Sequence, residues 1–129
     1  MKSFFLMILF LVITQSKVVA CPNEIARAPQ KHKASPYEVR LLKAIYKHEN
    51  SQHNGYCMAV LSPKYKGCEA QVKRCLGIIR AEWIKWERRG RKGSYINHLS
   101  SCYCPARWDK MGNANWRRGI KRMLKQEYK

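Results

Sequence analysis

Apolar residues recur every three or four positions in several stretches of this chain, and turn-forming residues separate those stretches. Such spacing places apolar side chains on one face of an α-helix. In the first stretch the repeating residues are Val39, Leu42, Ile45 and Tyr46. Ser35 suits the N-cap and Pro36 the first turn, so the pattern predicts a helix from residue 36 to about residue 49.

The strongest helical pattern covers residues 68 to 88. Its apolar face consists of Val72, Cys75, Leu76, Ile79, Trp83 and Trp86. Basic residues occupy many of the other positions, as expected for a helix with one side in water. We interpret Trp83 and Trp86 as core residues.

Two shorter helices are expected towards the C-terminus. The first has Ser94 as its N-cap and an apolar repeat of Tyr95, Leu99 and Tyr103. The second has Asn113 or Asn115 as its N-cap and an apolar repeat of Trp116, Ile120 and Met123.

The remaining segments have weaker patterns. Residues 21–34 contain two prolines and a basic run, and we expect an irregular N-terminal arm there. Residues 50–67 are rich in turn residues, and a short apolar run from Tyr56 to Leu61 follows an Asn-Gly turn. This run predicts a short hairpin or an extended wall beside the end of the first helix. The fold class is therefore mainly α with some α+β character, in one small domain of residues 21–129.

Residues 1–20 have the features of a secretory signal peptide. Lys2 supplies a positive charge, residues 4–13 an apolar segment, and Val18-Val19-Ala20 small residues before a cleavage point. The apolar segment is too short for a stable membrane span. We therefore expect an exported protein, periplasmic or extracellular, without a transmembrane segment in the mature chain. In the alternative interpretation, Cys21 carries a lipid anchor.

Six cysteines follow the cleavage point, and an even number in a small exported chain predicts three disulfides. They are Cys21, Cys57, Cys68, Cys75, Cys102 and Cys104. A lipid on Cys21 would leave one cysteine without a partner, which favours soluble export. The spacing does not decide the pairing. It also lacks the paired Cys-x-x-Cys motifs of zinc sites, so we expect no metal and no cofactor.

The chain has a formal net charge of +18 at pH 7, spread along its whole length. Such a charge favours anionic partners, among them cell-envelope polymers and acidic membranes. Export argues against nucleic acid as the physiological partner. Nothing in the sequence indicates an oligomer, so we expect a monomer.

Glu49 ends the first predicted helix on its apolar face, four residues after Ile45 and three after Tyr46. A carboxyl group buried in this way has a raised pKa unless it is paired. Glycoside cleavage needs a carboxylic acid that is still protonated near neutral pH as its general acid. Glu49 is therefore a candidate catalytic residue, although a frayed helix end before the polar residues 50–52 would have the same pattern.

Several segments, taken in order, carry a resemblance to a known family. They are Ala44-Ile45-Tyr46-x-x-Glu49, the turn at Tyr56, Arg74-Cys75-Leu76-x-x-Ile79-Arg80, Tyr103-Cys104-Pro105 and Asn115-Trp116. Over roughly residues 36–124 the chain resembles small bacterial lysozyme-like proteins of the soluble lytic transglycosylase type. It departs from their pattern after Glu49, where glycines are common, and at Gly119, where an asparagine is common.

The resemblance implies a lysozyme-like fold whose cleft cleaves peptidoglycan glycan strands between N-acetylmuramic acid and N-acetylglucosamine. It implies Glu49 as general acid and then base in a lytic transglycosylase or muramidase. Tyr56 and Tyr103 are candidates for binding the sugar or, equally, for the core. Hydrolysis would need a second group to position water, for which Asp109 and Glu69 are the candidates; without one, an anhydro end results.

The alternative function is that of a non-catalytic cationic exported protein. Such a protein would bind cell-wall glycan or an anionic membrane, and it would keep this effect without the Glu49 carboxylate. A purely electrostatic effect would be lost at high salt, because exposed charges are screened.

Overall fold

The structure is a computed structural model that describes residues 21–49, 58, 60 and 62–126. Its elements are α2 (Cys21–His32), α3 (Pro36–Glu49), the 3-10 helix η1 (Pro63–Tyr65), α4 (Cys68–Arg88), α5 (Tyr95–Tyr103) and α6 (Lys110–Gln126). Within these residues there is no strand, and the predicted mainly helical class is confirmed for them. No helix in the same ranges has the length and apolar character needed to cross a membrane.

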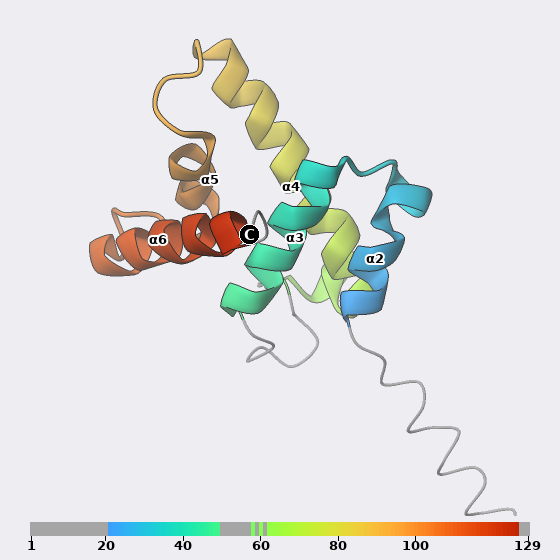
Figure 1. Cartoon of the computed structure of the whole chain (residues 1–129). Coiled ribbons are helices and arrows are strands. Elements are labelled where there is room, and N and C mark those ends of the chain that lie inside the picture. Colours follow the sequence, from blue (N-terminus) through green and yellow to red (C-terminus); the bar gives the residue numbers. More distant parts are fainter. Residues whose placement is uncertain (1–20, 50–57, 59, 61, 127–129) are drawn as a thin grey trace, which may run out of the picture.

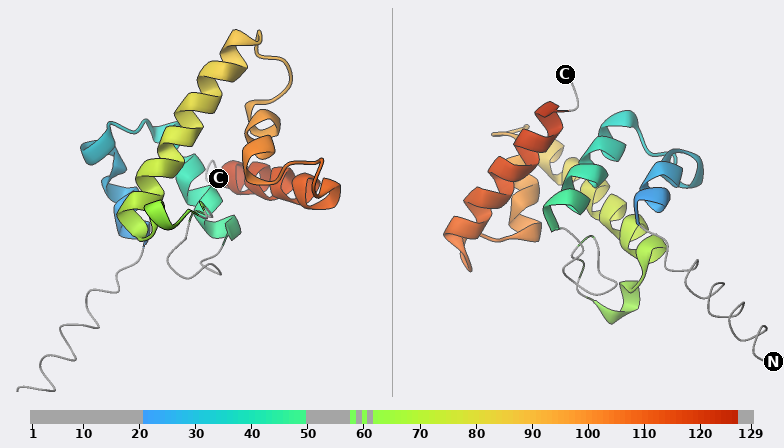
Figure 2. Two further views of the ribbon diagram at one scale, coloured as in Figure 1. Left: turned by 180° about the vertical axis from the view of Figure 1, so that it is seen from behind. Right: turned by 60° about the horizontal axis from the view of Figure 1, so that its bottom comes forward.

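Helix α4 is the longest of the described elements and forms the centre of a group with α2, α3 and α5 (Figure 1). Helices α2 and α3 pack on each other and on α4, while α5 packs on α4 from another side. Helix α6 packs across α3 and α5 (Figure 2). The core between these helices includes Leu41, Leu42, Ile45, Val72, Leu76, Ile79, Leu99, Trp116 and Ile120.

The helices predicted from apolar spacing are present with their expected caps on α3 and α5. Ser35 Oγ accepts a hydrogen bond from the Glu38 amide at 3.1 Å. Glu38 Oε1 accepts one from the Ser35 amide at 2.9 Å, which completes a capping box at the start of α3. Ser94 Oγ likewise accepts from the Asn97 amide at 3.1 Å and begins α5.

The expectation of an irregular N-terminal arm is wrong for residues 21–32, which form α2. Cys21, Ile25 and Ala28 are buried on the side that packs on α3 and α4. Their steps of four and three residues are a helical signal, but the signal is short and Pro29 obscures it. Packing of this face outweighs the helix-weakening effect of Pro29.

Helix α6 begins at Lys110, ahead of the two asparagines predicted to cap it. Asp109 Oδ1 accepts a hydrogen bond from the Gly112 amide at 2.8 Å, as an N-cap side chain does. Asn113 is instead a buried residue inside the helix, and its side-chain amide donates to Cys104 O at 2.7 Å. The predicted start was therefore too late because an asparagine in the core resembles a cap in the sequence.

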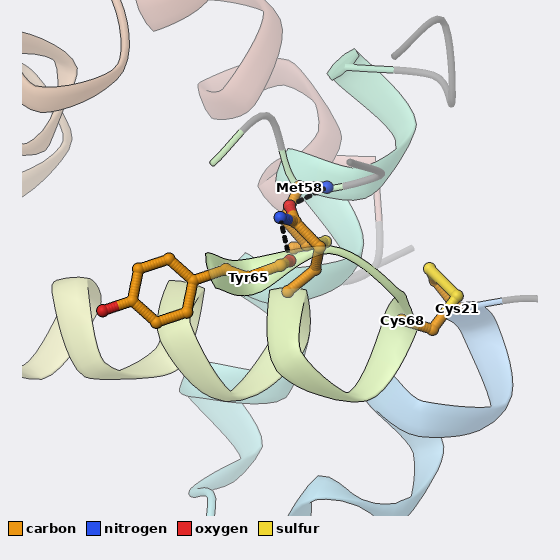
Figure 3. The surroundings of a disulfide bond; sticks show 5 residues. Cys21, Met58, Tyr65 and Cys68 are labelled. Carbon is orange, nitrogen blue, oxygen red and sulfur yellow. Dashed lines mark hydrogen bonds between the residues drawn. A yellow bond between two sulfur atoms is a disulfide. The ribbon is translucent and has the colours of Figure 1, made fainter. Parts of the chain in front are cut away.

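One disulfide joins Cys21, the first residue of α2, to Cys68, the first residue of α4 (Figure 3). Their Cα atoms lie 4.9 Å apart, although the two residues are 47 positions apart in sequence. The expected disulfide stapling is thus confirmed at this pair.

The prediction of three disulfides is not met among the described cysteines. Cys75, Cys102 and Cys104 carry free thiols, and Cys57 lies outside the described residues. Cys75 is fully buried and packs as a core residue. A count of cysteines cannot distinguish such a core residue from a disulfide partner.

The predicted hairpin or wall lies mostly outside the described residues, which include Met58 and Val60 of it. Buried Gln71 on α4 holds this segment. Its side-chain oxygen accepts from the Met58 and Val60 amides, each at 3.2 Å. Its side-chain nitrogen donates to the Tyr65 carbonyl (Figure 3) and, at 2.9 Å, to the Val60 carbonyl. The described part of the segment is therefore tied to α4 by side-chain bonds.

Candidate active site at the end of helix α3

Glu49 is the last residue of α3 and is partly buried. The indole N–H of Trp116 on α6 donates a hydrogen bond to Glu49 Oε1 at 3.1 Å. Trp116 is only 2% exposed, so this bond joins the end of α3 to the core. The Glu49 side chain therefore lies on the inner side of its helix, as its spacing from Ile45 and Tyr46 predicts.

Tyr103, the last residue of α5, lies next to this bond. Its ring stacks on Trp116, with centroids 5.2 Å apart and planes 13° from parallel. Its hydroxyl lies 2.7 Å from Cys75 Sγ on α4. Burial raises the pKa of Tyr103 well above its ordinary value, and the nearby Cys75 and Glu49 add to this. Tyr103 thus remains a neutral phenol whose hydroxyl is turned to Cys75.

Two thiols also lie near Glu49. Burial raises the pKa of Cys75 to about 12, and the Glu49 charge contributes. Burial, with smaller effects of Asp109 and Glu49, raises the pKa of Cys104 above its ordinary value. Both thiols therefore stay protonated at neutral pH, which makes them poor nucleophiles. They add two more neutral groups to the Trp116 indole and the Tyr103 phenol.

The close approach of α6 to the end of α3 depends on Gly119. A Cβ atom on Gly119 would lie 2.6 Å from His48 Nδ1, closer than real Cβ contacts. The His48 ring meets Trp116 edge-on, at 6.3 Å between centroids. Gly119, one of the departures from the family pattern, therefore lets His48 and Trp116 pack beside Glu49.

The apolar spacing around Trp116 predicts a core residue but does not reveal its hydrogen bond to Glu49. The available signal was chemical, because a buried tryptophan needs an acceptor for its indole N–H. Spacing alone cannot show that this acceptor is a glutamate 67 residues away in sequence.

The structure does not bring every candidate residue into the group around Glu49, which consists of Trp116, Tyr103, Cys75 and Cys104. Tyr56 lies outside the described residues. Asp109 acts on the pKa of Cys104, as Glu49 does, but its side chain is bonded to the Gly112 amide at the start of α6. Glu69 lies in the first turn of α4 with a side chain that is 69% exposed, and its Oε1 is 3.7 Å from Lys31 Nζ.

A separate groove of about 620 Å³ lies between the start of α3 and the middle of α4. Its lining includes Tyr37, Ile79, Trp83 and Ile84. Trp83 and Trp86 are partly buried against the core, as predicted. The charged groups of the groove are Glu38 and Arg80, which bond to each other at 2.6 Å. The groove is at the opposite end of α3 from Glu49 and offers no comparable acid.

Among the described residues, no three His, Cys, Asp or Glu side chains are grouped as a metal site requires. Comparisons of the chain with protein-family models, curated proteins and solved structures found no match. The basis for a functional proposal is therefore the chemistry of Glu49 and the side chains around it.

Proposed function

We propose that this protein cleaves peptidoglycan glycan strands between N-acetylmuramic acid and N-acetylglucosamine, with Glu49 as the general acid and base. The observation that carries the proposal is the setting of Glu49. It is a partly buried carboxyl group at a helix end, bonded by a buried indole and close to neutral Tyr103 and Cys75. Electrostatic interactions are stronger in such surroundings than in water, which suits proton transfer. The sequence resemblance to lytic transglycosylases points to the same residue.

In the proposed reaction, the Glu49 carboxyl group protonates the glycosidic oxygen as the bond from that oxygen to the muramyl anomeric carbon breaks. The carboxylate then accepts a proton from a hydroxyl group of the same muramic acid, whose oxygen bonds to the anomeric carbon. The product carries an anhydro end and no water is consumed. Trp116 acts as a positioning residue, because its N–H holds one carboxylate oxygen in place.

The roles of the other acidic candidates favour this one-carboxylate route over hydrolysis. Asp109 accepts the Gly112 amide at the start of α6, and Glu69 faces Lys31 on the exposed side of α4. A hydrolase would need one of its carboxylates to position water opposite the general acid.

We infer that the protein acts outside the cytoplasm, after removal of residues 1–20. The Cys21–Cys68 disulfide supports this inference, because such bonds persist in oxidising compartments. The bond also uses the sulfur that a lipid anchor on Cys21 would need, which favours the soluble form.

The proposal is tested by digestion of purified peptidoglycan with the oxidised mature protein, followed by mass spectrometry of the soluble fragments. We expect fragments with anhydro ends. Glu49→Gln should reduce their release by about a hundredfold to ten-thousandfold, because it removes the transferable proton. Glu69→Gln, at an exposed carboxylate, should leave release unchanged.

Two results would change the assignment. Reducing ends would replace the transglycosylase with a hydrolase and require a second carboxylate. Absence of fragments from the wild type would contradict cleavage, and binding of intact glycan that survives in Glu49→Gln would then establish the non-catalytic alternative.

A further inference from the structure

Two large apolar side chains are exposed to water at the turn between α5 and α6 and in the first turn of α6. Trp108 is 78% exposed and Met111 is 74% exposed. The turn is well bonded, since the amides of Trp108 and Asp109 donate to Pro105 O at 3.0 and 3.1 Å. Asp109 in turn caps α6. Both apolar side chains are thus displayed by an ordered turn and the helix that follows it.

Met111 is also the first member of an exposed line along α6. This line continues at steps of four and three residues through Asn115, Arg118, Arg122 and Lys125. Arg118 donates a hydrogen bond to Asn115 Oδ1 at 2.6 Å, within the line. The opposite face of α6 carries buried Trp116 and Ile120 and belongs to the core. The exposed line therefore faces solvent over most of the helix.

Among the described residues of this surface, every charge is positive except that of the Asp109 cap. Helix α6 contains six basic residues and no acidic one between Lys110 and Gln126. Before it, the Arg107 guanidinium lies 5.3 Å from the centre of the Trp108 ring. The nearby carboxylate is that of Asp109, and it is bonded to the Gly112 amide.

We propose that this surface, made of Arg107, Trp108, Met111, Arg118, Arg122 and Lys125, binds an anionic lipid bilayer. Trp108 and Met111 insert at the depth of the headgroups, where tryptophan is favoured. Arg118, Arg122 and Lys125 meet the lipid phosphates. A soluble polyanion would neutralise the same charges but leave both apolar side chains in water. A bilayer accommodates apolar and basic groups together, which is why it is the preferred partner.

The test is co-sedimentation of the oxidised mature protein with vesicles, independent of glycan cleavage. Binding is expected to vesicles of phosphatidylcholine mixed with phosphatidylglycerol, and little to phosphatidylcholine alone. Substitution of Arg118, Arg122 and Lys125 by Gln should weaken binding roughly a hundredfold, at about fivefold for each charge near the surface. The matched control replaces Lys66, Lys73 and Arg88, which removes the same charge elsewhere and should have a much smaller effect.

The apolar part of the proposal is tested with Trp108→Ala and Met111→Ala together. We expect about a tenfold loss of vesicle binding, because less apolar area leaves water. Ile84→Ala, at a 49% exposed residue on α4, should bind as wild type. Unchanged vesicle binding in the Trp108 and Met111 variant would overturn insertion. Equal binding to soluble duplex DNA, with the same insensitivity to Trp108, would assign the surface to polyanions instead.

Discussion

Glu49 and Glu82 both lie within the helical packing, but the structure surrounds them with different chemistry. Glu82 on α4 accepts hydrogen bonds from Lys85 Nζ and from His98 Nε2, both at 2.7 Å. Because a carboxylate can only accept, His98 Nε2 must carry the hydrogen. Burial acts to raise the pKa of Glu82, but these bonds outweigh it and hold that pKa below its ordinary value.

At Glu49 one donor is the neutral Trp116 indole, and burial keeps the nearby Tyr103 phenol and Cys75 thiol neutral. Glu82 therefore joins α4 to α5 as a stable carboxylate. Glu49 lies at the end of α3, where we propose that it exchanges a proton with the glycan. The comparison shows that burial alone does not fix the chemistry of a carboxylate, because the described hydrogen-bond partners differ between the two positions.

The largest difference expected between the two sites concerns their cysteines. Cys75, beside Glu49, is fully buried with a pKa of about 12. Cys102, beside Glu82, is exposed as a residue. Partial burial of its thiol and the nearby Glu82 nevertheless raise its pKa as well. Iodoacetamide should therefore modify Cys102 at least about a hundredfold faster in the native protein. Peptide mass spectrometry measures the modification rates of both cysteines. Equal rates would show that Cys75, beside Glu49, is accessible to solvent.

Removal of the Glu82 charge should lower stability. Glu82→Gln is expected to reduce the free energy of unfolding by about 2 kcal/mol, because it weakens two hydrogen bonds in a mostly buried position. Urea unfolding followed by circular dichroism measures this loss. Glu69→Gln, at an exposed ion pair, should change stability by less than about 0.5 kcal/mol. An equally small effect of Glu82→Gln would remove the structural role assigned to that residue.

The packing beside Glu49 can be tested with a pair of glycines. Gly119→Ala should lower the free energy of unfolding by about 1 kcal/mol, since the new methyl group meets the His48 ring. Gly77→Ala on α4 meets no atom within 4 Å and should raise it by about 0.5–1 kcal/mol. Thermal unfolding of both variants checks the signs. Stabilisation by both substitutions would mean that α6 does not approach α3 closely.

The smallest expected effect is on the way that stability falls with pH in the acid range. The pKa of Glu38 is also lowered, because bonds from Arg80 and the Ser35 amide outweigh the effect of its burial. The unfolded chain therefore binds more protons at Glu38 and Glu82 as the pH falls. Their contribution to stability is present above the ordinary carboxyl pKa, about 4, and is lost as the pH falls through the lowered folded values. Melting temperatures should fall less steeply with acid in the Glu38→Gln, Glu82→Gln double variant, and an unchanged slope would contradict this.

The helices of this fold could be predicted where local patterns are strong. Apolar residues spaced three and four positions apart predict α3 and α4, and Ser35 and Ser94 indicate where α3 and α5 begin. Helix α2 was missed because only three of its residues are buried and because Pro29 lies within it. The start of α6 was missed because Asn113 looks the same in sequence whether it caps a helix or bonds in the core.

The candidate site was predictable only in part. Glu49 lies on the inner side of α3, and its spacing from Ile45 and Tyr46 in the same helix predicts this. The contacts of Trp116, Tyr103 and Cys75 with one another join three helices, and no local pattern encodes such packing. Cysteine pairing is likewise a tertiary property, so the count of six did not reveal that Cys75 would be a core thiol.

The most direct test of the contrast between the two carboxylates measures cleavage and folding together. Fragment release from peptidoglycan would be measured for Glu49→Gln and Glu82→Gln, each corrected for its folded fraction from urea unfolding. We expect Glu82→Gln to be less stable but to cleave normally per folded molecule. We expect Glu49→Gln to be folded and to release almost no fragments. Fragment release by folded Glu49→Gln at the wild-type rate would contradict the catalytic role of Glu49.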